Sequence, residues 1–237
     1  MKLGILKTGQ PPAEIIDRFG TYPDMFKRLL GPDTYDYSVF AADEGELPEA
    51  PTACDAFLIT GSSAGVYEDR PWIAPAEDFL RAAKGKAALV GVCFGHQLMA
   101  QAFGGRVIKS PKGWGVGEQD YRVLKREPWM DDAQAIRLPG SHQDQVVELP
   151  PGAEVIAASD FSPFGALAWR DQPAISIQLH PEFEPAYAMA LIEARRGTRY
   201  TDDEANAAIA SYGAADDRAR VGGWINRFLE TTRLSRR

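Results

Sequence analysis

Short apolar runs alternate with helically spaced apolar residues through the first third of the chain. The runs at residues 3–6, 35–40 and 56–60 predict buried strands. Between the first two, apolar residues recur every three or four positions on either side of Gly20-Thr21-Tyr22-Pro23, which predicts a broken helix or two short ones. A further helix is predicted around residues 72–80. Strands that alternate with helices are typical of a parallel sheet covered by helices on both faces.

The next segment contains a strand, a sharp turn and a helix in immediate succession. Residues 87–90 predict a short buried strand that runs directly into Cys93, which has a glycine two positions away on each side. Residues 98–103 continue as a predicted helix, and Gly104-Gly105 ends it.

The second half of the chain changes from this alternation to closely spaced strands. Predicted strands at residues 121–124, 135–138, 154–158 and 166–169 indicate an antiparallel section. Another predicted strand, at residues 175–179, places His180 at its carboxyl end. Residues 185–237 are expected to be helical, with an apolar stripe formed by Trp224, Ile225, Phe228 and Leu229.

Composition narrows the class of protein and its partners. The chain has 237 residues, of which 45% are hydrophobic and 25% charged, as is usual for a globular protein. Its net charge of -7 argues against a nucleic-acid partner. The longest apolar stretch, residues 87–95, is far shorter than the roughly 20 residues of a membrane helix. No secretory apolar segment follows the N-terminal lysines, so we expect a cytoplasmic location.

Cys93 is the more reactive candidate of the two cysteines, Cys54 and Cys93. Two cysteines cannot form a disulfide framework, and a reducing compartment leaves a thiol free. Glycines on both sides of Cys93 allow the tight turn of a nucleophile elbow, with the thiol at a helix N-terminus that favours the thiolate. The glycine spacing alone also fits a small buried cysteine that only packs. We expect a structural role for Cys54, which lacks such a turn.

His180 and Glu182 add the groups that a cysteine nucleophile needs. Catalytic groups gather at the carboxyl ends of strands in open α/β sheets, which is where His180 is predicted. A neutral imidazole near Cys93 would accept the thiol proton and then protonate a departing amine. Glu182 would hold the imidazole in one tautomer, and Pro181 would stiffen the arrangement. The alternative is a hydrogen-bonded histidine at a strand end, which the presence of Cys93 disfavours.

Two sequence motifs resemble those of the class I glutamine amidotransferases. The segments are Gly91-Val92-Cys93-Phe94-Gly95-His96-Gln97 and Leu179-His180-Pro181-Glu182, which match a G-x-C-x-G-[HQ]-Q elbow and a distal H-P-E. The resemblance implies a flavodoxin-like, three-layer α/β fold with an open, mostly parallel sheet and a small antiparallel section. It implies a catalytic domain at residues 1–190 and a C-terminal helical extension at residues 191–237, packed on the same domain.

The resemblance also implies roles for individual residues. Cys93 would be the nucleophile, His180 the general acid and base, and Glu182 its partner, while the backbone amides of Gly61 and Phe94 would stabilise an oxyanion. The implied substrate-binding positions are Gln97, Ser141, His142, Gln143 and Asp144. No cofactor is implied for this half-reaction.

The loop after Gly61 departs from the usual family pattern. Many members have a proline there, whereas this chain reads Gly61-Ser62-Ser63-Ala64-Gly65. Similar loops followed by a segment like Asp69-Arg70-Pro71-Trp72-Ile73 occur in stand-alone members, including γ-glutamyl peptidase-like proteins. The loop is therefore expected to suit a substrate other than that of the synthase-linked members.

Other polar patterns do not indicate a site. Gly113-Trp114-Gly115-Val116-Gly117 precedes a predicted strand, unlike a phosphate-binding loop, and no metal-ligand spacing is present. We expect His96 to pack behind the elbow helix, and His142 either to orient its loop or to touch substrate. The arginines at 195, 196 and 199, with acidic residues nearby, are interpreted as a solvated helix boundary.

Three functions remain open on these observations. The first is a hydrolase of the amidotransferase type, which would cleave the γ-amide of glutamine or a γ-glutamyl compound through a Cys93 thioester and could pass ammonia to a separate synthase subunit. The second is a hydrolase of γ-glutamyl peptides or amines with no synthase partner. The third is a non-catalytic binding module, which the intact Cys93, His180 and Glu182 set disfavours.

Overall fold

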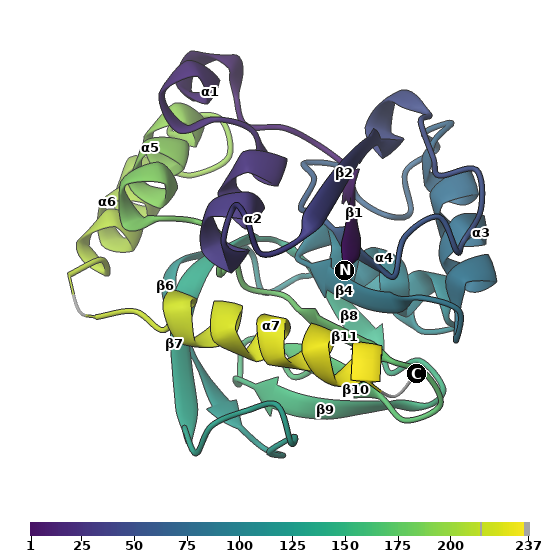
Figure 1. Cartoon of the computed structure of the whole chain (residues 1–237). Coiled ribbons are helices and arrows are strands. Elements are labelled where there is room, and N and C mark those ends of the chain that lie inside the picture. The colour runs from purple at the N-terminus through teal and green to yellow at the C-terminus, as the bar shows by residue number, and fades with distance from the viewer. Residues whose placement is uncertain (214, 235–237) are drawn as a thin grey trace.

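A nine-stranded mixed sheet forms the centre of the protein in the computed structural model, which describes residues 1–213 and 215–234 (Figure 1). In spatial order the strands are β2 (Asp36–Ala41), β1 (Lys2–Lys7), β3 (Ala56–Ile59), β4 (Ala88–Val92), β11 (Ala174–Ile177), β10 (Ala166–Trp169), β9 (Ala153–Ala158), β6 (Gly115–Val123) and β7 (Ala135–His142). The first five pair in parallel and the rest antiparallel. The predicted open α/β sheet with an antiparallel section is confirmed.

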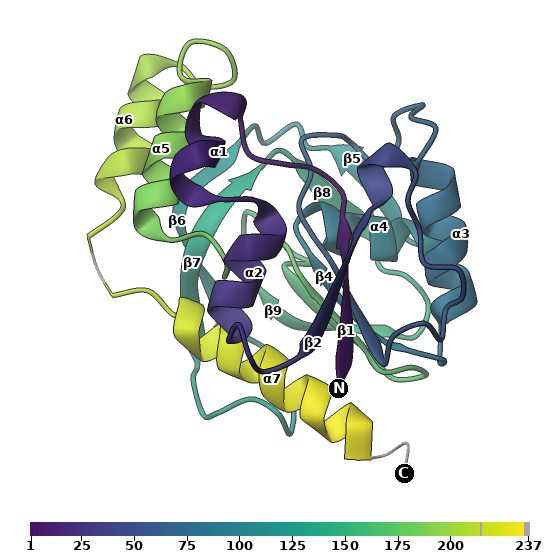
Figure 2. The same cartoon turned by 45° about the horizontal axis from the view of Figure 1, so that its top comes forward.

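Helices cover both faces of this sheet. They are α1 (Ala13–Phe19), α2 (Tyr22–Leu30), α3 (Ile73–Ala83), α4 (Phe94–Ala102), α5 (Pro185–Arg195), α6 (Asp202–Ala210) and α7 (Arg218–Leu234), with a 3₁₀ turn at Ala42–Glu44. Buried side chains of α2 and α7 pack in one apolar cluster with one face of the sheet, and those of α3 and α4 pack in a second cluster with the other face. Figure 2 shows α1, α5 and α6 gathered beside this three-layer body.

The interruption predicted near Gly20 produces two short helices. Gly20 has φ 81°, a conformation that favours glycine, and it ends α1. Thr21 then begins α2 with a capping box, in which its hydroxyl accepts from the backbone N–H of Asp24 and the Asp24 carboxylate accepts from the backbone N–H of Thr21. Local capping chemistry therefore decides between the two alternatives that the apolar spacing left open.

The strand before His180 is shorter than predicted. It ends at Ile177, whose carbonyl accepts the backbone N–H of Cys93 at 2.9 Å. Because β4 turns away at Cys93, the chain beyond Ile177 has no parallel partner to continue with. The N–H of His180 instead donates to the carbonyl of Pro139 in β7 at 2.9 Å. His180 thus lies three residues after the end of β11, the strand at which the parallel part of the sheet meets the antiparallel part.

A second sheet was not predicted from the sequence pattern. It pairs β5 (Arg106–Lys109) with β8 (Asp144–Glu148) in antiparallel register. Both strands are short and mix polar with apolar residues, so their period-two signal is weak. Helix α4 begins at Phe94, directly after Cys93, so Cys93 lies at a helix N-terminus as predicted.

The C-terminal segment contributes to the main core. Residues Val221, Trp224, Ile225, Phe228 and Leu229 of α7 are buried in the cluster that includes the central strands. The predicted helical segment at residues 185–237 is resolved into α5, α6 and α7; its positions 214 and 235–237 lie outside the described residues. Within residues 1–213 and 215–234, no helix has the length and apolar character needed to cross a bilayer.

Candidate active site

Cys93 occupies a strained turn between β4 and α4. Its φ is 53° and its ψ is -104°, and it is the only non-glycine residue with positive φ in the described part of the chain. Such a conformation costs about 1–3 kcal/mol and occurs mainly at functional sites. The turn also needs glycine at Gly91 and Gly95. A methyl group on Gly95 would lie 2.3 Å from the carbonyl oxygen of Ile59, and one on Gly91 would lie 2.6 Å from the carbonyl oxygen of Gly95.

His180 and Glu182 form a buried pair beside Cys93. Nδ1 of His180 is 2.8 Å from Oε1 of Glu182, and both side chains are almost completely removed from solvent. Burial lowers the pKa of His180, but the charges of Cys93 and Glu182 and their hydrogen bonds to the ring outweigh burial and raise that pKa to about 10. The imidazolium form is therefore favoured in this environment.

An aromatic cluster supports His180 from behind. Its ring stacks on that of Phe183, with centroids 3.8 Å apart, and Phe183 in turn contacts Tyr22 and Tyr187. These aromatic residues were not predicted as part of the site. The only sequence signal was the position of Phe183 directly after Glu182.

Gly61 and Phe94, the two residues expected to stabilise an oxyanion, lie next to Cys93. A methyl group on Gly61 would be 3.8 Å from Cβ of Cys93 and 3.1 Å from Cε1 of His180, so Gly61 lies beside both side chains. Phe94 is the first residue of α4, where backbone N–H groups have no partner within the helix. Gly61 and the first turn of α4 therefore border the Cys93 side chain.

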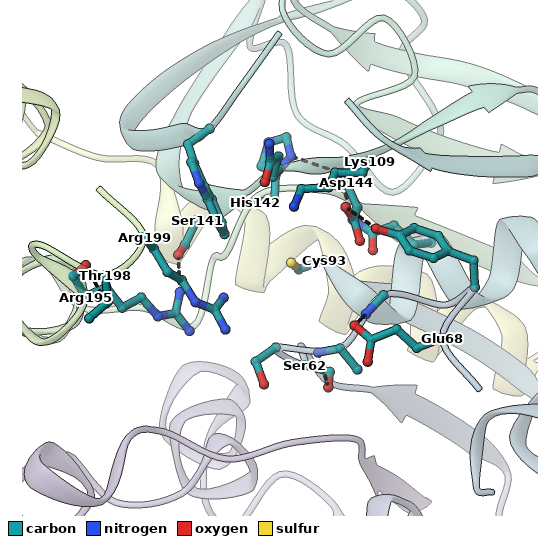
Figure 3. A pocket seen from close by; sticks show the side chains of 17 residues that line it. Ser62, Glu68, Cys93, Lys109, Ser141, His142, Asp144, Arg195, Thr198 and Arg199 are labelled. Atoms are coloured by element: carbon teal, nitrogen blue, oxygen red, sulfur yellow. Dashed lines mark hydrogen bonds between the residues drawn. The ribbon is translucent and has the colours of Figure 1, made fainter. Parts of the chain in front are cut away.

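The Cys93 thiol opens onto a cavity of about 360 Å³ (Figure 3). Its walls come from the loop after β3, the end of β7, the start of β8 and the turn after α5. The lining residues are Ser62, Ser63, Ala64, Gly65, Tyr67, Glu68, Cys93, Gln97, Lys109, Trp114, Ser141, His142, Gln143, Asp144, Arg195, Thr198 and Arg199. A volume of this size suits a small-molecule ligand.

All five residues expected to bind substrate line this cavity. Nε2 of Gln97 donates to the carbonyl of Asp144 and to Oε1 of Gln178, each at 3.0 Å, which ties α4 to the start of β8. The Asp144 carboxylate accepts from the Tyr67 hydroxyl at 3.0 Å, and burial raises its pKa. Gln143 lines the cavity too, and its carbonyl accepts from the backbone N–H of Ser110.

His142 and Ser141 have internal contacts as well. Nδ1 of His142 is 3.2 Å from the Asp144 carbonyl, and burial lowers the pKa of this histidine to about 4, so the ring is neutral near pH 7. The Ser141 hydroxyl accepts from Nη1 of Arg195 at 2.9 Å and lies 3.3 Å from the Tyr200 hydroxyl. Either residue is placed both to order its strand and to face a ligand.

The interpretation of the arginine cluster as a solvated boundary is incomplete, because two of the three arginines also line the cavity. Arg196 pairs with Glu193 and Asp202 on the surface. Arg195 and Arg199, in contrast, line the cavity with Thr198. The sequence between α5 and α6 is mostly polar. It therefore did not indicate which of the arginine side chains face the cavity.

The remaining histidine, cysteine and glycine-rich segment lie at different places around the site. His96 is fully buried, with Nδ1 2.8 Å from the Ser176 hydroxyl, and burial lowers its pKa to about 3. Cys54 is buried before β3 and does not line the cavity. Trp114 of the glycine-rich segment does line it. Among the residues that the structure describes, no cluster of three metal-ligating side chains occurs.

The chain resembles known proteins along most of its length. A family model, glutamine amidotransferase class-I, matches residues 14–194. A glutamine amidotransferase-like protein of Schizosaccharomyces pombe is 30% identical over 87% of this chain and 90% of its own, and γ-glutamyl peptidase 4 of Arabidopsis thaliana is 29% identical over 76% and 75%. One subunit of the glutamine-hydrolysing GMP synthase of Pyrococcus abyssi is 34% identical over 40% of this chain and 50% of its own.

A solved structure shows the same fold. It is a glutamine amidotransferase from Thermotoga maritima, which superposes with a TM-score of 0.76 at 17% identity and covers 98% of this chain and 97% of its own. The family match covers most of the chain. The elbow at Cys93 and the His180–Glu182 pair agree with this match. This chain belongs to the class I glutamine amidotransferase family.

Proposed function

We propose that the protein is a cysteine-nucleophile amidohydrolase that cleaves the γ-amide of glutamine or of a related γ-glutamyl compound. The observation that carries the proposal is the placing of a strained, cavity-lining Cys93 next to His180, whose ring is held by Glu182 at 2.8 Å. A nucleophile, a proton carrier and an orienting carboxylate are the parts that amide cleavage by a thiol requires.

In the proposed reaction the Cys93 thiolate attacks the γ-carbonyl carbon, and the carbonyl oxygen gains negative charge. The backbone amides of Gly61 and Phe94 would donate to this oxygen, each such donor being worth about 3–4 kcal/mol of transition-state stabilisation. The His180 imidazolium then gives its proton to the nitrogen, the carbon–nitrogen bond breaks, and ammonia or an amine leaves. A γ-glutamyl thioester remains on Cys93.

Hydrolysis of the thioester completes the cycle. Neutral His180 removes a proton from water, the hydroxide attacks the thioester carbonyl, and glutamate leaves as the carbon–sulfur bond breaks. The proton returns the imidazolium to its starting state. Gln97 and the Ser141–Asp144 segment are proposed to hold the α-amino and α-carboxylate groups, since all of these residues line the cavity.

Two versions of this function differ in the fate of the nitrogen. Similarity to the GMP synthase of Pyrococcus abyssi supports delivery of ammonia to a separate synthase partner, whereas the longer similarity to γ-glutamyl peptidase 4 supports a hydrolase that acts alone. The loop with Ser62 and Ser63 and the presence of two arginines in the cavity favour a substrate larger than glutamine. We therefore propose a hydrolase that acts without a synthase partner, in preference to one that delivers ammonia to a synthase.

The test is to incubate the purified protein with glutamine, γ-glutamyl dipeptides and γ-glutamyl amines and to follow release of glutamate. Cys93→Ala should abolish release, while Cys54→Ala, which removes the other buried thiol away from the cavity, should leave it unchanged. Acid quench of the wild type followed by mass spectrometry should detect the γ-glutamyl adduct on Cys93. Turnover that survives Cys93→Ala would overturn the mechanism, and absence of turnover of all three compound classes would favour a binding module.

A further inference from the structure

Two arginines face the cavity without an acidic partner. Within the described ranges, residues 1–213 and 215–234, Arg195 donates to the Ser141 hydroxyl but forms no ion pair, and the guanidinium of Arg199 has none either. The neighbouring Arg196 does pair with two carboxylates. Adjacent unpaired cations repel one another, and an anion placed between them would remove that repulsion.

The geometry holds Arg199 in place for such a contact. Its guanidinium carbon lies 5.6 Å from the centroid of the Trp114 ring, a cation–π distance, and Trp114 packs edge-on against Tyr200 with centroids 5.2 Å apart. Tyr200 is buried and lies 3.3 Å from the Ser141 hydroxyl. A guanidinium fixed on a braced aromatic ring loses little side-chain freedom when it binds an anion.

The charged groups of the cavity divide into two sides. In Figure 3, Arg195 and Arg199 lie to one side of Cys93, while Lys109, Asp144 and Glu68 lie to the other. The second side presents both signs of charge, which suits the α-amino and α-carboxylate groups of a γ-glutamyl unit. The first side presents only positive charge. A γ-carbonyl at Cys93 would therefore direct the leaving group toward the arginines.

We propose that Arg199, held on Trp114 and assisted by Arg195, binds a carboxylate on the leaving group, so that the preferred substrates are γ-glutamyl amino acids or peptides with a free C-terminus. Neither ammonia nor a neutral amine would use this subsite. Arg195, Thr198 and Arg199 follow residue 194, the last position of the family match, so these three residues lie outside the matched segment. The inference rests on the proposed function, which defines where the glutamyl unit lies.

The test compares γ-glutamylglycine with γ-glutamylglycinamide, which differ only in the terminal carboxylate, by measuring glutamate release. A charge-assisted contact should make kcat/KM about tenfold or more higher for the carboxylate compound. Arg199→Gln should reduce this ratio to near one, mainly by lowering kcat/KM for the carboxylate compound. Arg196→Gln, an equal charge change on the same turn but outside the cavity, should keep the wild-type ratio.

Equal turnover of the two compounds by the wild type, or an equal loss for both in Arg199→Gln, would overturn the subsite while leaving the proposed function intact. If neither compound is hydrolysed, the proposed function fails, and the subsite is still decided by calorimetry with Cys93→Ala. That variant should bind γ-glutamylglycine about tenfold more tightly than the glycinamide. Equal affinities would overturn the inference.

Discussion

The imidazole of His180 lies face to face with the ring of Phe183, with centroids 3.8 Å apart and ring planes at 5°. The face of an aromatic ring carries partial negative charge, so this contact favours the imidazolium over the neutral imidazole. Phe183 is itself held by Tyr187, edge-on at 4.6 Å, and by Tyr22, stacked at 5.8 Å. The charged form of His180 is thus supported on one edge by Glu182 and on one face by Phe183.

Phe183→Leu should weaken proton transfer without removing any polar group of the site. Loss of the stacked ring removes about 1 kcal/mol of stabilisation from the imidazolium, so kcat should fall roughly fivefold at pH values above the pKa of His180 and change little near pH 7. The alkaline limb of the kcat profile should also move to lower pH, because the pKa of His180 falls. Steady-state rates of glutamate release between about pH 6 and 10.5 measure both effects.

Tyr187→Phe is the matched control for that substitution. It keeps the ring that contacts Phe183 and removes only a hydroxyl, which lies 3.4 Å from the Tyr22 hydroxyl. The alkaline limb should remain at its wild-type position. An equal shift in both variants would show that Phe183 acts through packing alone.

Glu182→Gln should shift the alkaline limb of the kcat profile to lower pH, and by more than Phe183→Leu does. Burial lowers the pKa of His180, and the charges of Cys93 and Glu182 raise it to about 10; removal of one of these charges leaves burial less opposed. The imidazolium is retained below its pKa and lost as the pH rises through it, so activity should decline at lower pH than in the wild type. The rate at pH 7 should fall about 10²- to 10⁴-fold. An unmoved alkaline limb would contradict the role of Glu182.

The Cys93→Gly variant should be more stable than the Cys93→Ala variant. Glycine usually makes a protein less stable than alanine does, so this order is the reverse of the usual one. A φ of 53° with ψ of -104° strains any side chain, and relief of this strain should favour Cys93→Gly over Cys93→Ala by about 1–2 kcal/mol. Urea unfolding of the two variants measures the difference. The control is Ala207→Gly, at an exposed position inside α6. There glycine should lower the free energy of unfolding by about 1 kcal/mol relative to alanine.

Gly95→Ala should disrupt the elbow. The new methyl group would lie 2.3 Å from the carbonyl oxygen of Ile59 and 2.8 Å from its Cβ, so backbone must shift, at a cost of about 2–4 kcal/mol in unfolding free energy. The control is Gly223→Ala in α7, where the nearest atom is the flexible end of Arg227 at 3.4 Å. That substitution should be neutral or stabilise by up to about 1 kcal/mol, as measured by thermal or urea unfolding.

Much of the fold was evident from the sequence because it is encoded over short distances. Apolar runs and helical spacings identified the parallel strands and most helices, and the glycines around Cys93 indicated the turn. The strands β5 and β8 were missed, since four or five residues of mixed polarity carry too little periodicity. The end of β11 was placed two residues too late because pairing with β4 stops where the elbow turns away.

The sequence by itself determined the pair of motifs at Cys93 and His180-Pro181-Glu182. Both depend on local geometry, a glycine-lined turn and two side chains two residues apart, which the order of residues fixes. Only the tertiary structure decided what surrounds them. Arg195 and Arg199 reach the cavity because the end of α5 and the turn after it pack against β7, as the Arg195–Ser141 hydrogen bond shows. Contacts between segments far apart in the sequence produce no hydrophobic periodicity in either segment. The sequence therefore could not show which residues line the side of the cavity that faces the leaving group.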